Sequence, residues 1–270
     1  MLEIRNLHAG YGGTEILHGV DLSLPAGAVT VIVGPNGCGK STLLKTIAGI
    51  NPLMSGQVCL DGTDLEDLSP VMRARQVSYL SQSRQAADIT VQRLVLHGRF
   101  PYLSYPRRYR REDMEMARQA MAAVGIEDLA QRYMNTLSGG QRQKVYIAMT
   151  LAQDTPLVLM DEPTTYLDIA HQMQALAQAR FLADQGKTVA LVLHDLSAAL
   201  RNADHLVVMQ GGRVLQQGSA ESVFAGGCLN DAFGVRLERF HTTDGWQYYY
   251  REQTGQKTAI RDCSLDTDMI

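Results

Sequence analysis

The fold is decided by the stretch Gly34-Pro35-Asn36-Gly37-Cys38-Gly39-Lys40-Ser41-Thr42, which has the pattern of a phosphate-binding loop. It directly follows an apolar run that ends at Val33, and it opens a segment of helical period from Leu43 to Ile50. The glycines let backbone N–H groups approach phosphate oxygens, where side chains would block the approach. The start of the helix presents its positive end to the same anion. We therefore predict a strand, a loop and a helix that together bind ATP.

Two side chains at the end of this loop have roles that follow from the pattern. We expect Lys40 to reach the β- and γ-phosphates and so to act in catalysis, and the Ser41 hydroxyl to bind Mg²⁺. The alternative is a glycine-rich turn with a solvated lysine. The position between an apolar run and a helical segment favours the nucleotide site.

Two further apolar runs, Leu157–Met160 and Val189–Leu193, are continuous, as strands covered on both faces of a parallel sheet are. The first runs into Asp161-Glu162 and the second into His194. Ligands of open parallel sheets bind beyond the carboxyl ends of the strands, so these residues should meet the phosphate loop. We predict that Asp161 holds Mg²⁺, that Glu162 polarises the attacking water, and that His194 contacts the γ-phosphate or that water. Taken singly, Glu162 could only cap a helix and His194 could be structural.

The remaining segments predict an α/β fold whose core is a mixed, largely parallel sheet, with a helical subdomain inserted at about 88–152. The main domain would span 1–225, with a hairpin near its end across Gly211-Gly212. A small C-terminal extension, 226–270, would contain a second hairpin that turns at Asp244-Gly245.

The composition excludes several classes of protein. The 270 residues are 45% hydrophobic and 20% charged with a formal net charge of -3, which is ordinary for a globular protein and predicts no nucleic-acid partner. The four cysteines form no C-x-x-C pair, which favours reduced thiols over disulfides or zinc ligation. No apolar run approaches the ~20 residues of a membrane-spanning helix, and Glu3 and Arg5 stand where a signal peptide would be apolar. The basic run Arg107–Arg111 fits a solvated loop, with anionic lipid, a membrane partner or nucleic acid as alternatives.

A second glycine-containing stretch, Leu137-Ser138-Gly139-Gly140-Gln141, begins a helical segment and could also bind phosphate. It resembles the signature sequence of ABC ATPases, and other matching residues follow the order of that family. Tyr11 is similar to the aromatic residue that stacks on adenine. Gln82 is similar to the glutamine that contacts Mg²⁺ or water and senses the transporter, a metal-binding and catalytic role.

The resemblance covers the chain up to about Gly218 and implies a phosphate-loop ABC ATPase that binds ATP and Mg²⁺. It implies a homodimer in which Ser138, Gly139, Gly140 and Gln141 of one copy close over ATP held by the other. Asp168 would lie at the dimer seam, although Thr165-Tyr166-Leu167-Asp168 departs from the common S-A-L-D.

The stretch Asp161–Gln172 is similar to the branch that drives import of iron-siderophores, haem and vitamin B12. The partners would then be permease subunits in the membrane and, through them, a substrate-binding protein. The motor would lie at the cytoplasmic face of the cell membrane. The alternative is a soluble ABC ATPase, such as one for iron–sulfur cluster assembly.

Overall fold

A six-stranded sheet forms the centre of the protein in a computed structural model that describes residues 1–81, 88–165, 167–243 and 245–252. Its strand order is β10-β9-β3-β8-β7-β6, and every neighbouring pair is parallel except β9 and β10. The strands are β3 (Val29–Val33), β6 (Val77–Leu80), β7 (Leu157–Met160), β8 (Thr188–Val192), β9 (His205–Gln210) and β10 (Arg213–Gly218). The predicted mixed, largely parallel sheet is confirmed.

The strand before the phosphate loop lies inside this sheet, between β8 and β9. All residues of β3, β7 and β8 are buried, which explains why each is a continuous apolar run. The loop after β3 leads into α1 (Lys40–Ile47), which begins at the loop's own lysine and not at Leu43. The carboxyl ends of β3, β7 and β8 therefore carry the predicted functional residues to one edge.

Strands from the N-terminal part of the chain form a second, antiparallel sheet, which was not predicted from the sequence. Its order is β2-β1-β4-β5, with bounds Thr14–Leu24, Leu2–Tyr11, Leu53–Leu60 and Thr63–Asp64. Irregular pairing interrupts β1 between Ile4 and Leu7, where Asn6 has a φ of 46°. Such a bulge breaks the alternation of apolar and polar residues by which a half-buried strand is recognised.

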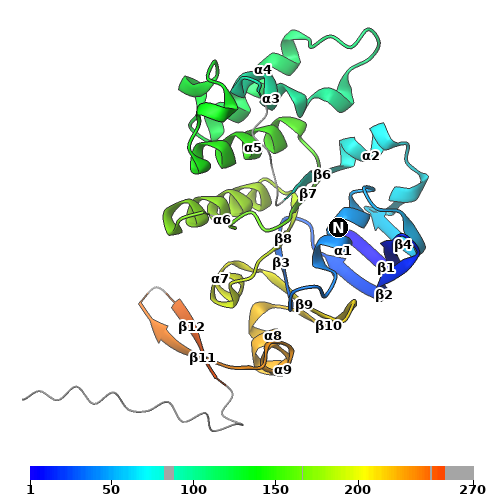
Figure 1. Cartoon of the computed structure of the whole chain (residues 1–270), viewed down its shortest axis with the longest axis vertical. Coiled ribbons are helices and arrows are strands. Elements are labelled where there is room, and N and C mark those ends of the chain that lie inside the picture. The colour runs from blue at the N-terminus through cyan, green and yellow to red at the C-terminus, as the bar shows by residue number, and fades with distance from the viewer. Residues whose placement is uncertain (82–87, 166, 244, 253–270) are drawn as a thin grey trace, which may run out of the picture.

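Helices from the middle of the chain lie together at the top of Figure 1: α3 (Val91–His97), α4 (Arg111–Ala123) and α5 (Gly139–Gln153). Arg99 links α4 to α5. Its guanidinium contacts Asp113 Oδ1 on α4 at 3.2 Å and donates to the Ala152 carbonyl on α5 at 2.9 Å. Their buried side chains belong to the same apolar cluster as some of the buried side chains of β3, β7 and β8. The helical region is therefore packed onto the sheet, and its limits at 88 and 152 stay a prediction.

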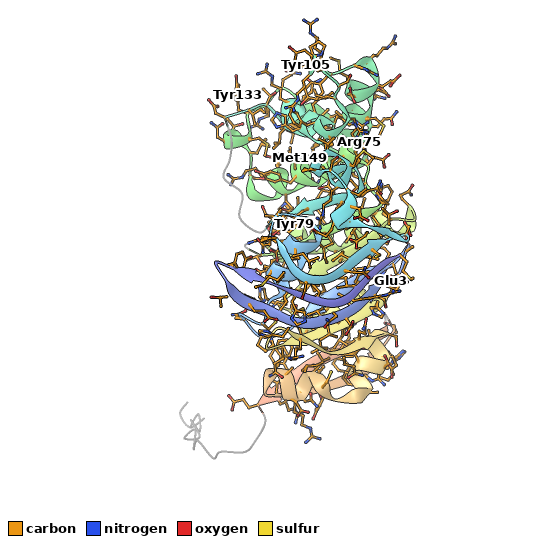
Figure 2. The ribbon with its side chains drawn as sticks, turned by 90° about the vertical axis from the view of Figure 1, so that its right-hand side faces the viewer. Glu3, Arg75, Tyr79, Tyr105, Tyr133 and Met149 are labelled. Carbon is orange, nitrogen blue, oxygen red and sulfur yellow. The ribbon has the colours of Figure 1, made fainter. Side chains whose placement is uncertain are left out.

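The view turned by 90° shows how these parts are stacked. In Figure 2, Tyr79 lies between the helical region, which carries Tyr105 and Tyr133, and the N-terminal sheet, which carries Glu3. The other helices are α2 (Pro70–Gln76), α6 (Ile169–Asp184), α7 (Leu196–Asn202), α8 (Ala220–Gly226) and α9 (Cys228–Phe233), with short 3₁₀ turns at Leu65–Asp67, Phe100–Tyr102, Glu127–Leu129 and Met134–Thr136. Within the described ranges, no helix combines the length and apolar character that crossing a membrane requires.

The predicted C-terminal hairpin is present as β11 (Val235–Thr242) and β12 (Gly245–Glu252). It lies at the lower left of Figure 1 in orange. Residue Asp244 of its turn lies outside the described residues. The hairpin is fastened to α7, because the Ser197 hydroxyl donates to the Tyr248 carbonyl at 2.8 Å.

Candidate functional site

A cavity of about 270 Å³ opens at the edge where β3, β7 and β8 end. It gathers residues predicted from four separate parts of the sequence: the N-terminal hairpin, the phosphate loop, the end of β7 and the end of β8. The lining residues are Tyr11, Ile16, Asn36, Gly37, Gly39, Lys40, Ser41, Thr42, Glu162 and His194. Ile16 was not predicted. The pair of apolar residues Ile16-Leu17 could have indicated it. Neighbouring side chains of a strand point to opposite faces, so with Leu17 buried in the core, Ile16 faces the cavity side.

The glycines of the phosphate loop are required by its conformation. Gly37 and Gly39 have φ values of 77° and 102°, in the region that residues with a Cβ avoid. A Cβ at Gly34 would overlap the Met209 carbonyl of β9. The loop can therefore pack against β9 and keep its N–H groups accessible only with glycine at these positions. Gly34, Pro35 and Cys38 are part of the loop but are not among the residues that line the cavity.

The Lys40 ammonium is held within the loop itself. Nζ donates to the Gly34 carbonyl at 2.7 Å and to the Pro35 carbonyl at 3.0 Å, and it lies 3.8 Å from Cys38 Sγ. Only 5% of the residue is exposed. The loop thus presents a positive charge beside its N–H groups, which is the arrangement that attracts a phosphate.

Asp161 is the buried acid of the site, and hydroxyl groups hold both of its carboxylate oxygens. The Ser41 hydroxyl donates to Oδ1 and the Tyr79 hydroxyl to Oδ2, each at 2.9 Å. A carboxylate beside a hydroxyl is an oxygen donor set of the kind that Mg²⁺ prefers, so these residues fit that ion. Tyr79 was not predicted, because its place beside Asp161 follows from the pairing of β6 with β7 and not from a motif.

Glu162 and His194 are in direct contact, with 2.5 Å between Glu162 Oε1 and His194 Nε2. The Thr165 hydroxyl donates to the other carboxylate oxygen at 3.0 Å. The glutamate side chain is 11% exposed and the histidine side chain 45%. The φ of Glu162 is 50°, a strained value for a residue with a side chain, and such strain gathers at functional sites. The carboxylate is therefore oriented at the cavity wall, as a base that polarises water must be.

The predicted signature residues lie apart from this cavity. Ser138 and Gly139 are exposed, and none of Ser138–Gln141 is among the lining residues. Ser138 Oγ accepts from the Gln141 backbone N–H at 3.2 Å, and the Gln141 side chain accepts from the Ser138 N–H at 3.1 Å. This reciprocal capping begins α5 at Gly139. Asp168 is also exposed, and Gln82 lies outside the described residues.

Asp168 caps α6 through its own side chain. Oδ1 accepts from the backbone N–H of His171 at 2.9 Å and from the imidazole Nδ1 of the same residue at 2.7 Å. These two hydrogen bonds, the backbone one foremost, lower the pKa of Asp168. The carboxylate is therefore kept charged on the surface beside the signature helix.

The comparisons with known proteins agree with this geometry. The model of the ABC transporter domain family matches residues 17–165, which include the phosphate loop, the signature and the Asp161-Glu162 pair. The achromobactin transport ATP-binding protein of Dickeya dadantii is 43% identical over 86% of this chain and 87% of its own length. The ferric enterobactin transport ATP-binding protein of Escherichia coli is 42% identical over 85% and 86%.

Solved structures of the same kind share the fold. A chain of a metal-chelate type ABC transporter in an inward-facing conformation superimposes with a TM-score of 0.80 at 25% identity, covering 94% of this chain and 98% of its own. The dimeric structure of a bacterial ABC transporter cassette gives a TM-score of 0.71 at 27% identity, with 82% and 99% covered.

Proposed function

The chain belongs to the ABC transporter family as an ATP-binding subunit with ATPase activity, and on this premise we propose that it drives import of an iron chelate through a membrane permease. The observation that carries the ATPase assignment is the single cavity lined by the phosphate loop, Glu162 and His194. The relatives' names support a ferric siderophore as cargo. The name of a further relative, a hemin import ATP-binding protein of Pseudomonas entomophila that is 37% identical over 87% of this chain, supports haem as an alternative cargo. Corrinoid cargo rests on the resemblance of the Asp161–Gln172 stretch alone. The relatives favour an importer over a soluble assembly ATPase.

Residues in and around the cavity would divide the binding of ATP and Mg²⁺ among them. Tyr11 stacks on adenine, and Lys40 turns its ammonium from the Gly34 and Pro35 carbonyls to the β- and γ-phosphates. Ser41 and Asp161 would hold Mg²⁺, which supplies charge neutralisation at the phosphates when it is bound. Gln82 would complete this set. Backbone N–H groups of the loop residues after Pro35, up to Thr42, bind the phosphate oxygens.

Hydrolysis needs a base directed at the attacking water, and Glu162 is the residue placed for it. Its carboxylate accepts the proton of a water that lies in line with the γ-phosphate. Thr165 and His194 each hold one carboxylate oxygen and so orient the base at the cavity before ATP binds, and the Thr165 hydrogen bond remains if His194 turns away. His194 is the more exposed partner and can turn to the γ-phosphate.

We infer that two copies share each ATP. The signature, Ser138, Gly139, Gly140 and Gln141, would close over the ATP of the partner with its exposed residues Ser138 and Gly139 foremost, and Asp168 would lie at the seam. The similarity to a dimeric cassette supports this arrangement. The dimer would dock on permease subunits at the cytoplasmic face of the cell membrane and meet a substrate-binding protein only through them. Nucleic acid has no part in this function.

The test of the cargo is reconstitution of the complete complex in lipid vesicles. Binding protein loaded with a ferric siderophore should stimulate ATPase activity several-fold, whereas the iron-free siderophore should not. A complex that carries Glu162→Gln is the matched control, and neither ligand should stimulate its ATPase activity. Stimulation by a sugar or an amino acid alone would reject the iron-chelate assignment and leave the ATPase intact.

A further inference from the structure

The imidazole of His171, in the first turn of α6, covers the signature glycine Gly140. A Cβ built on Gly140 would overlap three atoms of that ring, Nε2, Cδ2 and Cε1. Gly140 is buried, although Ser138 and Gly139 beside it are exposed. The missing side chain of Gly140 is thus needed within the same chain, to make room for a ring from another helix.

The same imidazole binds Asp168 from its other side. Nδ1 lies 2.7 Å from Asp168 Oδ1, while Nε2 is at the Gly140 end of the ring. The carboxylate accepts this hydrogen bond, so the ring is fixed in one orientation. One side chain therefore touches the signature and the acidic residue at the predicted dimer seam, two elements about thirty residues apart in sequence.

A second contact joins the same two elements. The Gln143 side chain on α5 donates to the Pro163 carbonyl at 3.1 Å, in the segment between Glu162 and Asp168. The Gln172 side chain donates to the Leu167 carbonyl at 2.9 Å, which fixes the end of that segment on α6. The segment before Asp168 is thus held near its start by the signature helix and at its end by α6. Of these contacts, that of His171 lies nearest the signature.

We propose that His171 is a positioning residue that holds the signature and Asp168 of its own chain in a fixed relation, so that both meet the partner's ATP together. The proposal rests on the shared dimeric site proposed above. His171 acts through Gly140 and Asp168, and it leaves the phosphate loop of its own chain unaffected. Its loss should therefore weaken closure of the dimer, while ATP binding by a single copy is unchanged.

The experiment uses the full chain carrying Glu162→Gln, in which ATP-loaded dimers should accumulate. His171→Ala should raise the ATP concentration for half-maximal dimerisation about tenfold, the size expected when a charge-assisted hydrogen bond and a packed ring are lost together. Binding of a fluorescent ATP analogue, measured at protein concentrations too low for dimers, should change less than twofold. In the active background, the apparent KM should rise about tenfold with a smaller change in kcat.

Two conservative variants separate the functions of the ring. His171→Asn keeps a donor near the position of Nδ1 but uncovers Gly140, and His171→Phe keeps the ring but loses the hydrogen bond. Each should recover part of the dimerisation that His171→Ala loses. Failure of both to recover any dimerisation would overturn the proposal, and so would unchanged dimerisation of His171→Ala.

A double-variant cycle tests the contact itself. Gly140→Ala should weaken dimerisation strongly, because its methyl group displaces the ring, and His171→Ala in the same chain should recover part of that loss. If the losses of dimerisation in the two single variants simply add in the double variant, the proposal is overturned. Weaker ATP-analogue binding by the dilute His171→Ala chain would also overturn it, since His171 would then support the phosphate loop of its own chain. If the parent chain with Glu162→Gln forms no ATP-dependent dimer, the proposal that two copies share each ATP is wrong. The melting temperatures of the two single variants and the double variant would then still show whether the His171 ring and Gly140 are coupled.

Discussion

At the scale of single residues, Glu162 combines a strained backbone with two fixed carboxylate oxygens. Glu162→Gln should keep ATP affinity and lower turnover by about 10²–10⁴-fold, because the amide cannot accept the proton of the attacking water. Steady-state hydrolysis gives the rate, and gel filtration with ATP should reveal an accumulated dimer. Glu115→Gln, an exposed acid on α4, is the matched control and should behave as wild type. Equal turnover in both variants would reject Glu162 as the base.

Tyr11 differs from the other lining residues in offering a ring and no charge. Tyr11→Ala should weaken nucleotide binding by about 1–3 kcal/mol, the range measured for aromatic stacking on a base. The loss should be similar for ATP and GTP, because both purines have a face to stack on. Titration of a fluorescent nucleotide measures it. Tyr133→Ala is a control of equal exposure, 50% against 47%, on the helical region. An unchanged affinity in Tyr11→Ala would remove the ring from the adenine site.

The residues that could be predicted from the sequence are those within a local motif. Lys40, Ser41, Glu162 and His194 meet in one cavity because each lies in the segment that leaves the carboxyl end of a buried strand. Tyr79 and Thr165 hold the two acids and could not be predicted. Their contacts depend on strand order and on the path of the loop after β7, which no spacing of residue types records.

At the scale of elements, the helix behind the phosphate loop depends on one arginine from outside it. Arg73 on α2 is 9% exposed and donates to the Thr46 and Ile47 carbonyls at the end of α1, and it also pairs with Glu66 at 2.7 Å. Arg73 supplies a donor to the Ile47 carbonyl and a second donor to the Thr46 carbonyl, which also accepts from the Gly49 N–H. Its charge also complements the negative end of the helix dipole.

Arg73→Met should therefore lower the free energy of unfolding by about 2–3 kcal/mol, since buried carbonyls lose a charged donor. Urea denaturation followed by circular dichroism measures the change. Arg118→Met removes an arginine from an exposed pair on α4 and should cost less than about 0.5 kcal/mol. The same loss in both variants would show that the helix end does not need this partner.

Elements were predictable where burial is uniform along them. The strands β3, β7 and β8 are buried throughout, and the two hairpins have glycine-containing turns, so both kinds could be located. The N-terminal sheet was missed because the register shifts in β1 break its alternation. The start of the helix after the phosphate loop was predicted at Leu43 and lies at Lys40, because Lys40, Ser41 and Thr42 begin α1 without apolar character.

At the scale of the whole molecule, the separation of the cavity from the signature suggests that neither copy has a complete site. Lys40→Ala and Ser138→Arg should each abolish ATPase activity, by loss of the cation at the phosphates and by a bulky group at the signature. Mixing the two should restore part of the activity, because one site of a mixed dimer pairs an intact loop with an intact signature. Hydrolysis against mixing ratio is the measurement, with each variant mixed with itself as the control. A wild-type rate per molecule that does not change with protein concentration would contradict the dimer.

The central position of β3 in the sheet means that this strand must wait for its neighbouring strands while the chain is being synthesised. Val31 pairs with Leu191 on one side and Leu206 on the other, so both neighbours of this strand are synthesised long after it. At about 5–20 residues per second, roughly 160–175 residues take some 8–35 s to follow it from the ribosome. Throughout that interval the largely apolar strand Val29–Val33 lacks the neighbouring strands that bury it. Slow codons between residues 34 and 205 would therefore lengthen the exposure of this strand to other unfolded chains.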